Sequence, residues 1–531
     1  MSVLIYSLPK RSIGSIIVAL LAAFPQIKAQ EGVNIVDGSI TVGANHTLVV
    51  GGIIKNQKSA ANFIVESDAN LLQISNTQNS GEFTVLRNAE IKRLDYVYWS
   101  SPVQNQMLKA FSPGTLDARF MTYNEATDYF TSVPAPKTTA FIPAKGYAIR
   151  ADNRYPAWSG APAVTDFRNF VGAFVGTVNN GPQPFALAKS RNGYNLVGNP
   201  YPSDIDLDGD QGVFAQNSNS IEPVAYFWNN RIIYSAPASG QEYNGENYAI
   251  YNKSGSVPSS NSTKKATGIV KVGQGFIVQA KTTGQSLNFT NNSRVAGSSA
   301  DIFYHRNQSK SKNRFWLQLT TPNNDFNTIL IAYLSEASND FELGYDAPLM
   351  SNGSDSFYSV LNDYQLGIQG RRYPMEKTDR VILGSHHFTA GNHMISLQDA
   401  EGIFEADQPV YLKDKATGTV TNLSERNYEF NADQGITEGR FEIIYQADTT
   451  LNTGVAAKEG LTAYRDGADY VIKSTAKTIK EVTFYDAVGR MVLHFKPDNK
   501  EIKVNLNQLT PGVYIVKINH EGALISKKIL K

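Results

Sequence analysis

The chain has 531 residues, which is too long for a single hydrophobic core and indicates roughly three or four domains. It contains no cysteine, which excludes disulfides, thiolate nucleophiles and cysteine-ligated zinc or iron–sulfur sites. Its formal net charge is +1, so we expect no broad basic face and no nucleic-acid partner.

Tyrosine and phenylalanine are abundant, with 27 and 26 copies, whereas charged residues make up only 18% of the chain. Glycine, asparagine, serine and threonine separate short apolar runs. This composition favours strands and turns over helices, and it predicts an all-β, multidomain protein.

Residues 1–29 have the pattern of a signal peptide. Lys10 and Arg11 supply positive charge, residues 12–24 form an apolar run too short to span a membrane, and Ala29 offers a small residue for cleavage. The alternative is a buried N-terminal strand, which does not explain this order of features. No later run is long enough to cross a bilayer as a helix, so we expect a mature chain without a transmembrane helix, outside the cytoplasm.

Residues 30–93 contain short apolar runs, such as 48–50, 63–65 and 83–85, separated by turn-forming residues at uneven spacing. Such runs predict either a short β-solenoid-like coil or a strand meander.

Residues 94–300 form a β-rich region with two similar segments. Each segment begins with a strand that stops at a proline turn, at Pro102 and at Pro200. Each ends with a glycine that precedes an aromatic-led strand, at Gly146 and at Gly275. Proline cannot donate a ladder hydrogen bond, so both turns should end strand pairing. Two related modules explain the similarity, and so does common turn chemistry.

Residues 301–447 contain several runs with alternating apolar and polar side chains and turn signals between them, which predicts a β-sandwich. Residues 448–460 have no periodic apolar face and are predicted to be a linker. Residues 461–531 contain seven candidate strands. A domain of about 70 residues is near the lower size limit for independent folding, so we expect its apolar faces to pack closely.

The final domain carries a Tyr-Asp pair, a Gly-Arg pair, a Pro-Gly-Val-Tyr turn and a basic tail. These residues are Tyr485, Asp486, Gly489, Arg490, Pro511, Gly512, Val513, Tyr514, Lys527 and Lys528. With these motifs the domain resembles the type A C-terminal sorting domain of type IX secretion system cargo from Bacteroidetes-type bacteria.

This resemblance implies a C-terminal Ig-like sandwich that acts as the outer-membrane export signal. It implies the type IX translocon and a sortase-like protease as partners, passage through the periplasm, and release or attachment to surface lipopolysaccharide. The alternative is an ordinary C-terminal Ig-like domain.

Five short segments of the body also match a known group of proteins. The segments are Trp99-Ser100-Ser101-Pro102-Val103, Gly198-Asn199-Pro200-Tyr201-Pro202-Ser203, Gly273-Gln274-Gly275-Phe276, Ile368-Gln369-Gly370-Arg371 and Tyr411-Leu412-Lys413-Asp414. Through them the body resembles large surface proteins that this system carries in gliding and biofilm-forming bacteria. The resemblance supplies no catalytic residue and implies a secreted or cell-surface β-protein.

An acidic segment carries Asp204, Asp206, Asp208 and Asp210 at every second position. Alternating carboxylates with a glycine can wrap a hard cation, so calcium is a hypothesis for this loop. The position that a complete EF-hand fills with glutamate is Ala215, so the loop is not an EF-hand. A solvated aspartate-rich turn is the alternative.

Two further clusters have weaker functional interpretations. His386, His387 and His393 lie in a predicted hairpin tip and could ligate zinc, but that loop contains no Asp or Glu as a further ligand, so a polar loop is favoured. The aromatic segments 96–99 and 226–228 could stack on sugar rings, but sandwiches ordinarily bury such residues.

The linker segment Asp448-Thr449-Thr450 resembles the short acidic O-glycosylation sequence of these bacteria, so Thr449 is a candidate glycosylation site.

Two functions are compatible with these features. The first is a secreted or surface-attached adhesin, matrix or binding protein without catalysis, with lipopolysaccharide or extracellular polysaccharide as candidate partners. The second is a secreted polysaccharide-active hydrolase whose acidic pair cannot be identified, because Asp and Glu are scattered along the chain. No catalytic motif is found, and no cofactor is predicted apart from the calcium of the acidic loop.

Overall fold

The protein is all-β and multidomain. The computed structural model describes residues 26–29, 32–91, 95–152, 168–229, 247–296, 312–350, 355–446, 461–475, 477–520 and 523–531. The chain divides into two compact units, Met1–Glu222 with Gly268–His305, and Pro223–Thr267 with Arg306–Lys531. Within the described residues, no helix is both long and apolar enough to cross a membrane.

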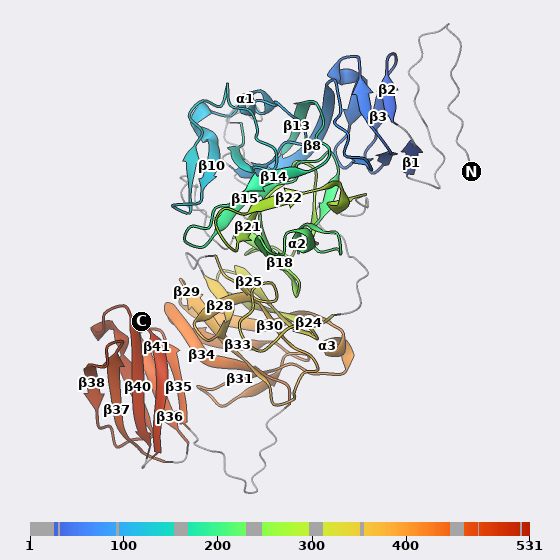
Figure 1. Ribbon diagram of the computed structural model, residues 1–531. Coiled ribbons are helices and arrows are strands. Elements are labelled where there is room, and N and C mark those ends of the chain that lie inside the picture. The colour runs from blue at the N-terminus through green and yellow to red at the C-terminus, as the bar shows by residue number, and fades with distance from the viewer. Residues whose placement is uncertain are drawn as a thin grey trace. The chain divides into compact units, whose positions relative to one another are not determined.

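The first unit begins with a parallel coil of short strands (Figure 1). Strand β1 pairs with β4 and β4 with β7, β2 pairs with β5, and β3 pairs with β6, which pairs with β8, all in parallel. A meander would pair neighbouring strands antiparallel, so the pairing selects the solenoid-like alternative. The strands are β1 (Gln26–Ala29), β2 (Val33–Ile35), β3 (Ile40–Val42), β4 (Thr47–Val50), β5 (Ile54–Asn56), β6 (Phe63–Val65), β7 (Asn70–Gln73) and β8 (Phe83–Ile91).

Apolar side chains of successive turns stack inside this coil. Val42, Val65 and Val85 occupy paired positions and are buried. The rings of Phe63 and Phe83 make an edge-to-face contact with centroids 5.0 Å apart. A Cβ at Gly81 would lie 1.9 Å from the carbonyl oxygen of Asn56, so the turn before β8 requires glycine.

The rest of the first unit contains two antiparallel strand pairs in equivalent sequence contexts. Strand β9 (Tyr96–Trp99), which precedes the first proline turn, pairs with β12 (Tyr147–Arg150). Strand β15 (Tyr194–Gly198), which precedes the second, pairs with β21 (Gly275–Ala280). The arrangement favours the hypothesis of two related modules, which stays a prediction.

Bridges between the two pairs are also equivalent. Trp99 bridges Gln274, and Val197 bridges Lys145, so the last or penultimate residue of each first strand meets a residue one or two positions before the other pair's second strand. The remaining elements of this unit are α1 (Leu108–Phe111), β10 (Phe120–Asn124), β11 (Tyr129–Ser132), β13 (Arg168–Gly176), β14 (Gln183–Ala186), β16 (Asp204–Asp206), α2 (Val213–Gln216), β20 (Ile269–Val270), β22 (Ser286–Phe289) and β23 (Arg294–Val295).

Residues 223–267 belong to the second unit, although the sequence places them in the 94–300 region. Their strands are most of β17 (Ile221–Trp228), then β18 (Tyr248–Asn252) and β19 (Gly255–Val257). The indole of Trp316 donates to the carbonyl of Ser256 at 2.8 Å, and Lys265 pairs with Asp399 at 2.6 Å. These contacts with residues far along the chain explain the difference, because the order of residues in the sequence does not reveal which distant side chains a segment packs against.

Most of the second unit is one long sheet that bends around a shared core. Side chains of β24 and β25, such as Phe315 and Ile331, share a buried cluster with Phe441 and Ile443 of β34. The elements are β24 (Asn313–Thr320), β25 (Phe326–Leu334), β26 (Ala347–Pro348), β27 (Ser356–Leu361), β28 (Tyr364–Arg372), β29 (Arg380–His387), β30 (Gly391–Glu401), α3 (Ile403–Ala406), β31 (Tyr411–Asp414), β32 (Val420–Asn422), β33 (Tyr428–Ala432) and β34 (Gly435–Ile444).

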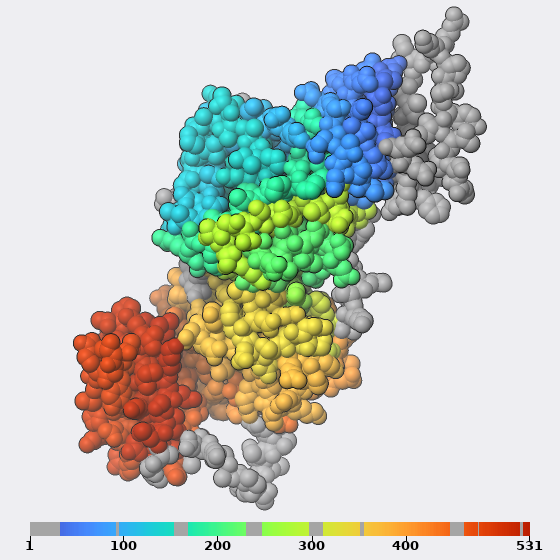
Figure 2. All heavy atoms as spheres, in the orientation of Figure 1, coloured from blue at the N-terminus to red at the C-terminus, as the bar shows by residue number. Residues whose placement is uncertain are grey.

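The C-terminal strands form two layers around a core of their own. One layer contains β35, β36 and β39, and the other has the order β38-β37-β40-β41. Their side chains make a continuous surface, orange-red to red in Figure 2. The strands are β35 (Leu461–Asp466), β36 (Asp469–Ser474), β37 (Ile479–Asp486), β38 (Met491–Phe495), β39 (Glu501–Asn505), β40 (Val513–His520) and β41 (Ala523–Leu530).

Candidate functional site

The Tyr-Asp and Gly-Arg pairs of the C-terminal domain build the hairpin turn between β37 and β38. The Asp486 carboxylate accepts the backbone N–H of Val488 at 3.1 Å and that of Arg490 at 2.9 Å. It also accepts the Arg490 guanidinium at 2.8 Å. Gly489 has φ +82°, a left-handed conformation that favours glycine. The motif residues therefore meet in one exposed turn.

Electrostatics within the turn keep Asp486 ionised. The backbone hydrogen bond from Arg490 lowers the pKa of Asp486 most, and the Arg490 side chain and the N–H of Val488 lower it further, whereas burial opposes them. Tyr485, the preceding residue, has its ring 5.1 Å from the ammonium of Lys517 on the neighbouring strand β40.

The Pro-Gly-Val-Tyr segment fixes the start of β40. The Tyr514 hydroxyl donates to the carbonyl of Thr510 at 2.7 Å, and Gly512 exchanges two backbone hydrogen bonds with Lys531 at 3.0 and 2.9 Å. A tyrosine that bonds the backbone a few residues upstream is the corner arrangement of Ig-type sandwiches. The segment thereby ties the end of the chain to the domain core.

The basic tail lies on β41, which is the edge strand of its sheet. Lys527 and Lys528 are exposed, and Lys528 pairs with Asp363 at 2.6 Å. Lysines on an edge strand oppose pairing with other chains. The tail thus presents positive charge along an edge that is otherwise open to strand addition.

Two predicted processing sites are only partly described. The described residues do not include residues 1–25 of the predicted signal peptide or Thr449 in the linker. Residues Gln26–Ala29 form strand β1, whose Ala29 pairs with Val50. Cleavage after Ala29 would therefore remove the first strand of the coil from the mature chain.

The acidic loop does not gather its four carboxylates. Asp204 is buried, and its carboxylate pairs with Lys271 at 2.8 Å and accepts the backbone N–H of Val272 at 3.3 Å. Asp206 accepts the backbone N–H of Asp208 at 2.9 Å, which is a local turn interaction. The loop leaves Asp206, Asp208 and Asp210 as candidate calcium ligands, and calcium binding stays a prediction for those three.

A second group of polar side chains lies at the end of hairpin β29–β30. His387 Nδ1 lies 3.0 Å from His393 Nε2, and both rings are buried. Asp355, which precedes β27, is half-buried beside them, and ligand atoms of the three residues lie within 4.8 Å of one another. Sequence reasoning missed Asp355, because strands β27 and β28 separate it from β29, which carries His387. The local sequence shows only that Asp355 comes just before a strand, which does not indicate a metal ligand.

Each member of this group has an additional partner. His387 Nε2 lies 2.9 Å from Ser385 Oγ, and His393 Nδ1 lies 3.0 Å from the carbonyl of Gly391. The Asp355 carboxylate accepts the backbone N–H of Phe388 at 2.8 Å. Burial, reinforced by the charges of His393, His386 and Arg440, lowers the pKa of His387 to about 3. Burial also lowers the pKa of His393, against the hydrogen bond to Gly391 and the charge of Asp355.

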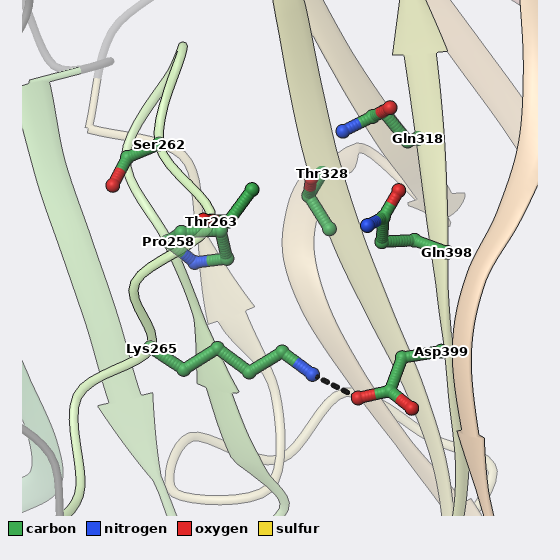
Figure 3. Close-up of a pocket in the computed structure, with 8 residues that line it drawn as sticks. All are labelled: Pro258, Ser262, Thr263, Lys265, Gln318, Thr328, Gln398 and Asp399. Atoms are coloured by element: carbon green, nitrogen blue, oxygen red, sulfur yellow. Dashed lines mark hydrogen bonds and ion pairs between the residues drawn. The ribbon is translucent and has the colours of Figure 1, made fainter.

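A small cavity of about 130 Å³ opens between the 258–265 loop and strands β24, β25 and β30 (Figure 3). Seven of its eight lining residues are polar, and its single carboxylate, Asp399, points toward Lys265. Retaining and inverting glycosidases ordinarily need two facing carboxyl groups, which this cavity does not supply. The lining residues are Pro258, Ser262, Thr263, Lys265, Gln318, Thr328, Gln398 and Asp399.

The aromatic segments proposed for sugar stacking are mostly core. Tyr98, Trp99, Tyr226 and Phe227 are buried, as is Tyr96. Trp228 is half-buried and makes an edge-to-face contact with Tyr248. The core interpretation therefore holds for these positions.

Comparisons with known proteins identify both parts of the chain. A family described as "Domain of unknown function (DUF8693)" matches residues 12–445. A family described as "Secretion system C-terminal sorting domain" matches residues 468–531. The C-terminal match confirms the resemblance to type IX secretion cargo. No curated protein matches the chain.

Solved structures also match part of the chain. Among them is PorZ, a bacterial surface component of the type-IX secretion system of Porphyromonas gingivalis. The identity is 11%, the TM-score is 0.12, and the match covers 54% of this chain and 50% of that chain. The chain thus spans about half the length of that structure.

Proposed function

Because the chain belongs to the DUF8693 family and ends in a type IX sorting domain, we propose that it is a non-catalytic adhesin, matrix or binding protein outside the cell. The sorting domain makes the chain cargo of the type IX machinery and directs it to the surface or the medium. We further propose that a sortase-like protease removes this domain in the 448–460 linker, and that the body is released or joined to lipopolysaccharide.

The observation that carries the non-catalytic proposal is that three buried carboxylates of the body are each paired with a cation, while another, Asp346, accepts backbone N–H groups. Asp204 pairs with Lys271, Asp414 with Arg440, and Glu442 with Arg380. A glycosidase needs one carboxyl group to stay protonated and another to act as base or nucleophile beside a sugar. Carboxylates that are fixed by cations inside sheet cores serve packing instead.

The architecture supports a binding role. The parallel coil presents sheet faces built from repeated short strands, and the rest of the body consists of sheets around apolar cores. Binding of an extended polymer can use such faces without a deep pocket. Extracellular polysaccharide is the partner class that we propose for them.

The proposal is tested in cells that lack the native gene. They are complemented with the full chain or with a version that lacks residues 448–531, and cell-surface, medium and periplasmic fractions are probed with antibody to the body. We expect the full chain at the surface or in the medium and the truncated chain in the periplasm. Equal export of the truncated chain would contradict the sorting role.

Adhesion separates the binding proposal from the hydrolase alternative. Surface attachment or matrix retention should be restored by the full chain and not by the truncated chain. Purified full chain should bind matrix polysaccharide without releasing reducing ends. Release of reducing ends, with loss in variants of a carboxylate pair, would replace the binding proposal with the hydrolase.

A further inference from the structure

The group at the end of hairpin β29–β30 has the composition and spacing of a transition-metal site. We propose that His387 Nδ1, His393 Nε2 and the Asp355 carboxylate bind one zinc ion, with a water molecule as the fourth ligand. Two zinc-bound nitrogens in a tetrahedral site lie roughly 3.3 Å apart, given Zn–N distances near 2.0–2.1 Å. The observed separation of 3.0 Å between the two histidine nitrogens requires only a small movement to reach that value.

The outer partners orient the histidines for ligation. His393 Nδ1 faces the carbonyl of Gly391, which can only accept, so Nδ1 carries the proton and Nε2 presents a lone pair. His387 Nε2 faces Ser385 Oγ, which can accept its proton and leave a lone pair on Nδ1. Metal-bound histidines ordinarily donate their other N–H to such a partner. The two nitrogens that carry these lone pairs then face each other, 3.0 Å apart.

The same contacts allow an alternative without metal. Ser385 would donate to His387 Nε2, and His387 Nδ1 would donate to His393 Nε2, which gives a simple hydrogen-bonded chain. That alternative does not use Asp355, whose carboxylate lies within 4.8 Å of the imidazole nitrogens. A carboxylate has about four lone-pair positions, so the bond from Phe388 leaves room for a cation.

Zinc is favoured over calcium or magnesium by the ligands. Imidazole nitrogens suit zinc and its neighbours, whereas calcium and magnesium take oxygen ligands. Asp355 is only half-buried, so the group has a path from solvent.

The ion would join three chain segments. Asp355 precedes β27, His387 ends β29, and His393 lies near the start of β30. An exported protein without cysteine cannot fasten these segments with a disulfide. A metal that binds only the folded chain stabilises it by mass action.

The test uses purified full chain without a histidine tag, stripped of metal with chelator. Calorimetric titration with zinc chloride should give one ion per chain, and zinc should raise the melting temperature of one transition by roughly 5 °C. Cobalt(II) should give the strong visible absorption of a tetrahedral site. No zinc uptake at micromolar concentrations, or an octahedral cobalt spectrum, would overturn the proposal.

Variants locate the ion. Asp355→Asn keeps the side-chain shape, and His393→Gln replaces the buried ring; each should weaken zinc binding by about a hundredfold or more. His386→Gln is the matched control, because His386 neighbours His387 on β29 but is not part of the group. The assignment is wrong if His386→Gln weakens zinc binding as much as His393→Gln does, or if Asp355→Asn leaves the affinity for zinc unchanged. The cobalt spectrum of the unaltered chain decides the question even if the His393 variant does not fold.

Discussion

The guanidinium of Arg440 donates two hydrogen bonds to the carboxylate of Asp414, at 3.0 and 2.9 Å, and both residues are buried in the second unit. The carboxylate also accepts the Tyr428 hydroxyl at 2.8 Å and the backbone N–H of Ala416 at 2.8 Å. The pair therefore ties β31 to β34 at a point with little access to water.

The first prediction concerns this ion pair. Asp414→Asn should destabilise the second unit by about 3 kcal/mol, because it leaves the Arg440 charge buried without its counterion. Asp363→Asn breaks the exposed pair with Lys528, whose side chains are 71% and 50% exposed, and should cost under about 0.5 kcal/mol. Urea unfolding measures both; equal effects of the two substitutions would contradict the argument.

The same pair predicts an acid response. Burial alone would raise the pKa of Asp414, but the hydrogen bonds and charge of Arg440 lower it. A carboxyl group with a lowered folded pKa stabilises the fold above its unfolded pKa, and this contribution is lost as pH falls through the folded pKa. We expect melting curves of the unaltered chain to lose more stability below pH 4 than those of Asp414→Asn.

Asp346 predicts the opposite dependence near neutral pH. Burial raises its pKa to about 7, although its carboxylate accepts the backbone N–H groups of Glu342 and Gly370. The folded state then binds a proton that the unfolded state has released above pH 4, so stability falls as pH rises toward 7 and levels off above it. The decline should be roughly 2 kcal/mol between pH 5 and 7.5.

Asp346→Asn provides the comparison for that slope. The side chain at position 346 cannot titrate in this variant. Its melting temperature should therefore lack the decrease between pH 5 and 7.5 that Asp346 causes in the unaltered chain. A variant with the same slope as the unaltered chain would assign the pH dependence to other groups.

The hairpin turn of the sorting domain gives a fourth prediction. Gly489→Ala should destabilise the domain by roughly 1 kcal/mol, because an alanine at φ +82° is strained. No atom lies within 4 Å of the added Cβ, so the cost comes from backbone conformation and not from a clash. Gly489→Asn is the matched control, since asparagine tolerates this conformation. Hydrogen exchange of the β37–β38 turn measures the effect, and equal protection in both variants would contradict it.

The fold of the C-terminal domain could be predicted closely because its information is local. Val504 and Leu506 are buried, whereas the adjacent Lys503 and Asn505 are exposed. The alternation of apolar and polar residues in a strand predicts this burial pattern. The turn at Asp486 and Gly489 likewise depends on residues that are neighbours in sequence. The acidic loop depends on more than local sequence: its alternating carboxylates suggested a calcium loop, but Asp204 pairs with Lys271, which lies far along the chain.

The sequence by itself determined that this protein is built from strands and that its last domain carries the motifs and turns of a sorting domain. The strands follow from period-two alternation, and the sorting domain follows from its resemblance to a known family through residues a few positions apart. Only the tertiary structure decided that the N-terminal strands coil in parallel, that residues 223–267 join the second unit, and that Asp355 lies beside His387 and His393. Those relationships depend on which strands pair, and pairing is set by the register between distant segments and by the shared core, neither of which a local pattern encodes.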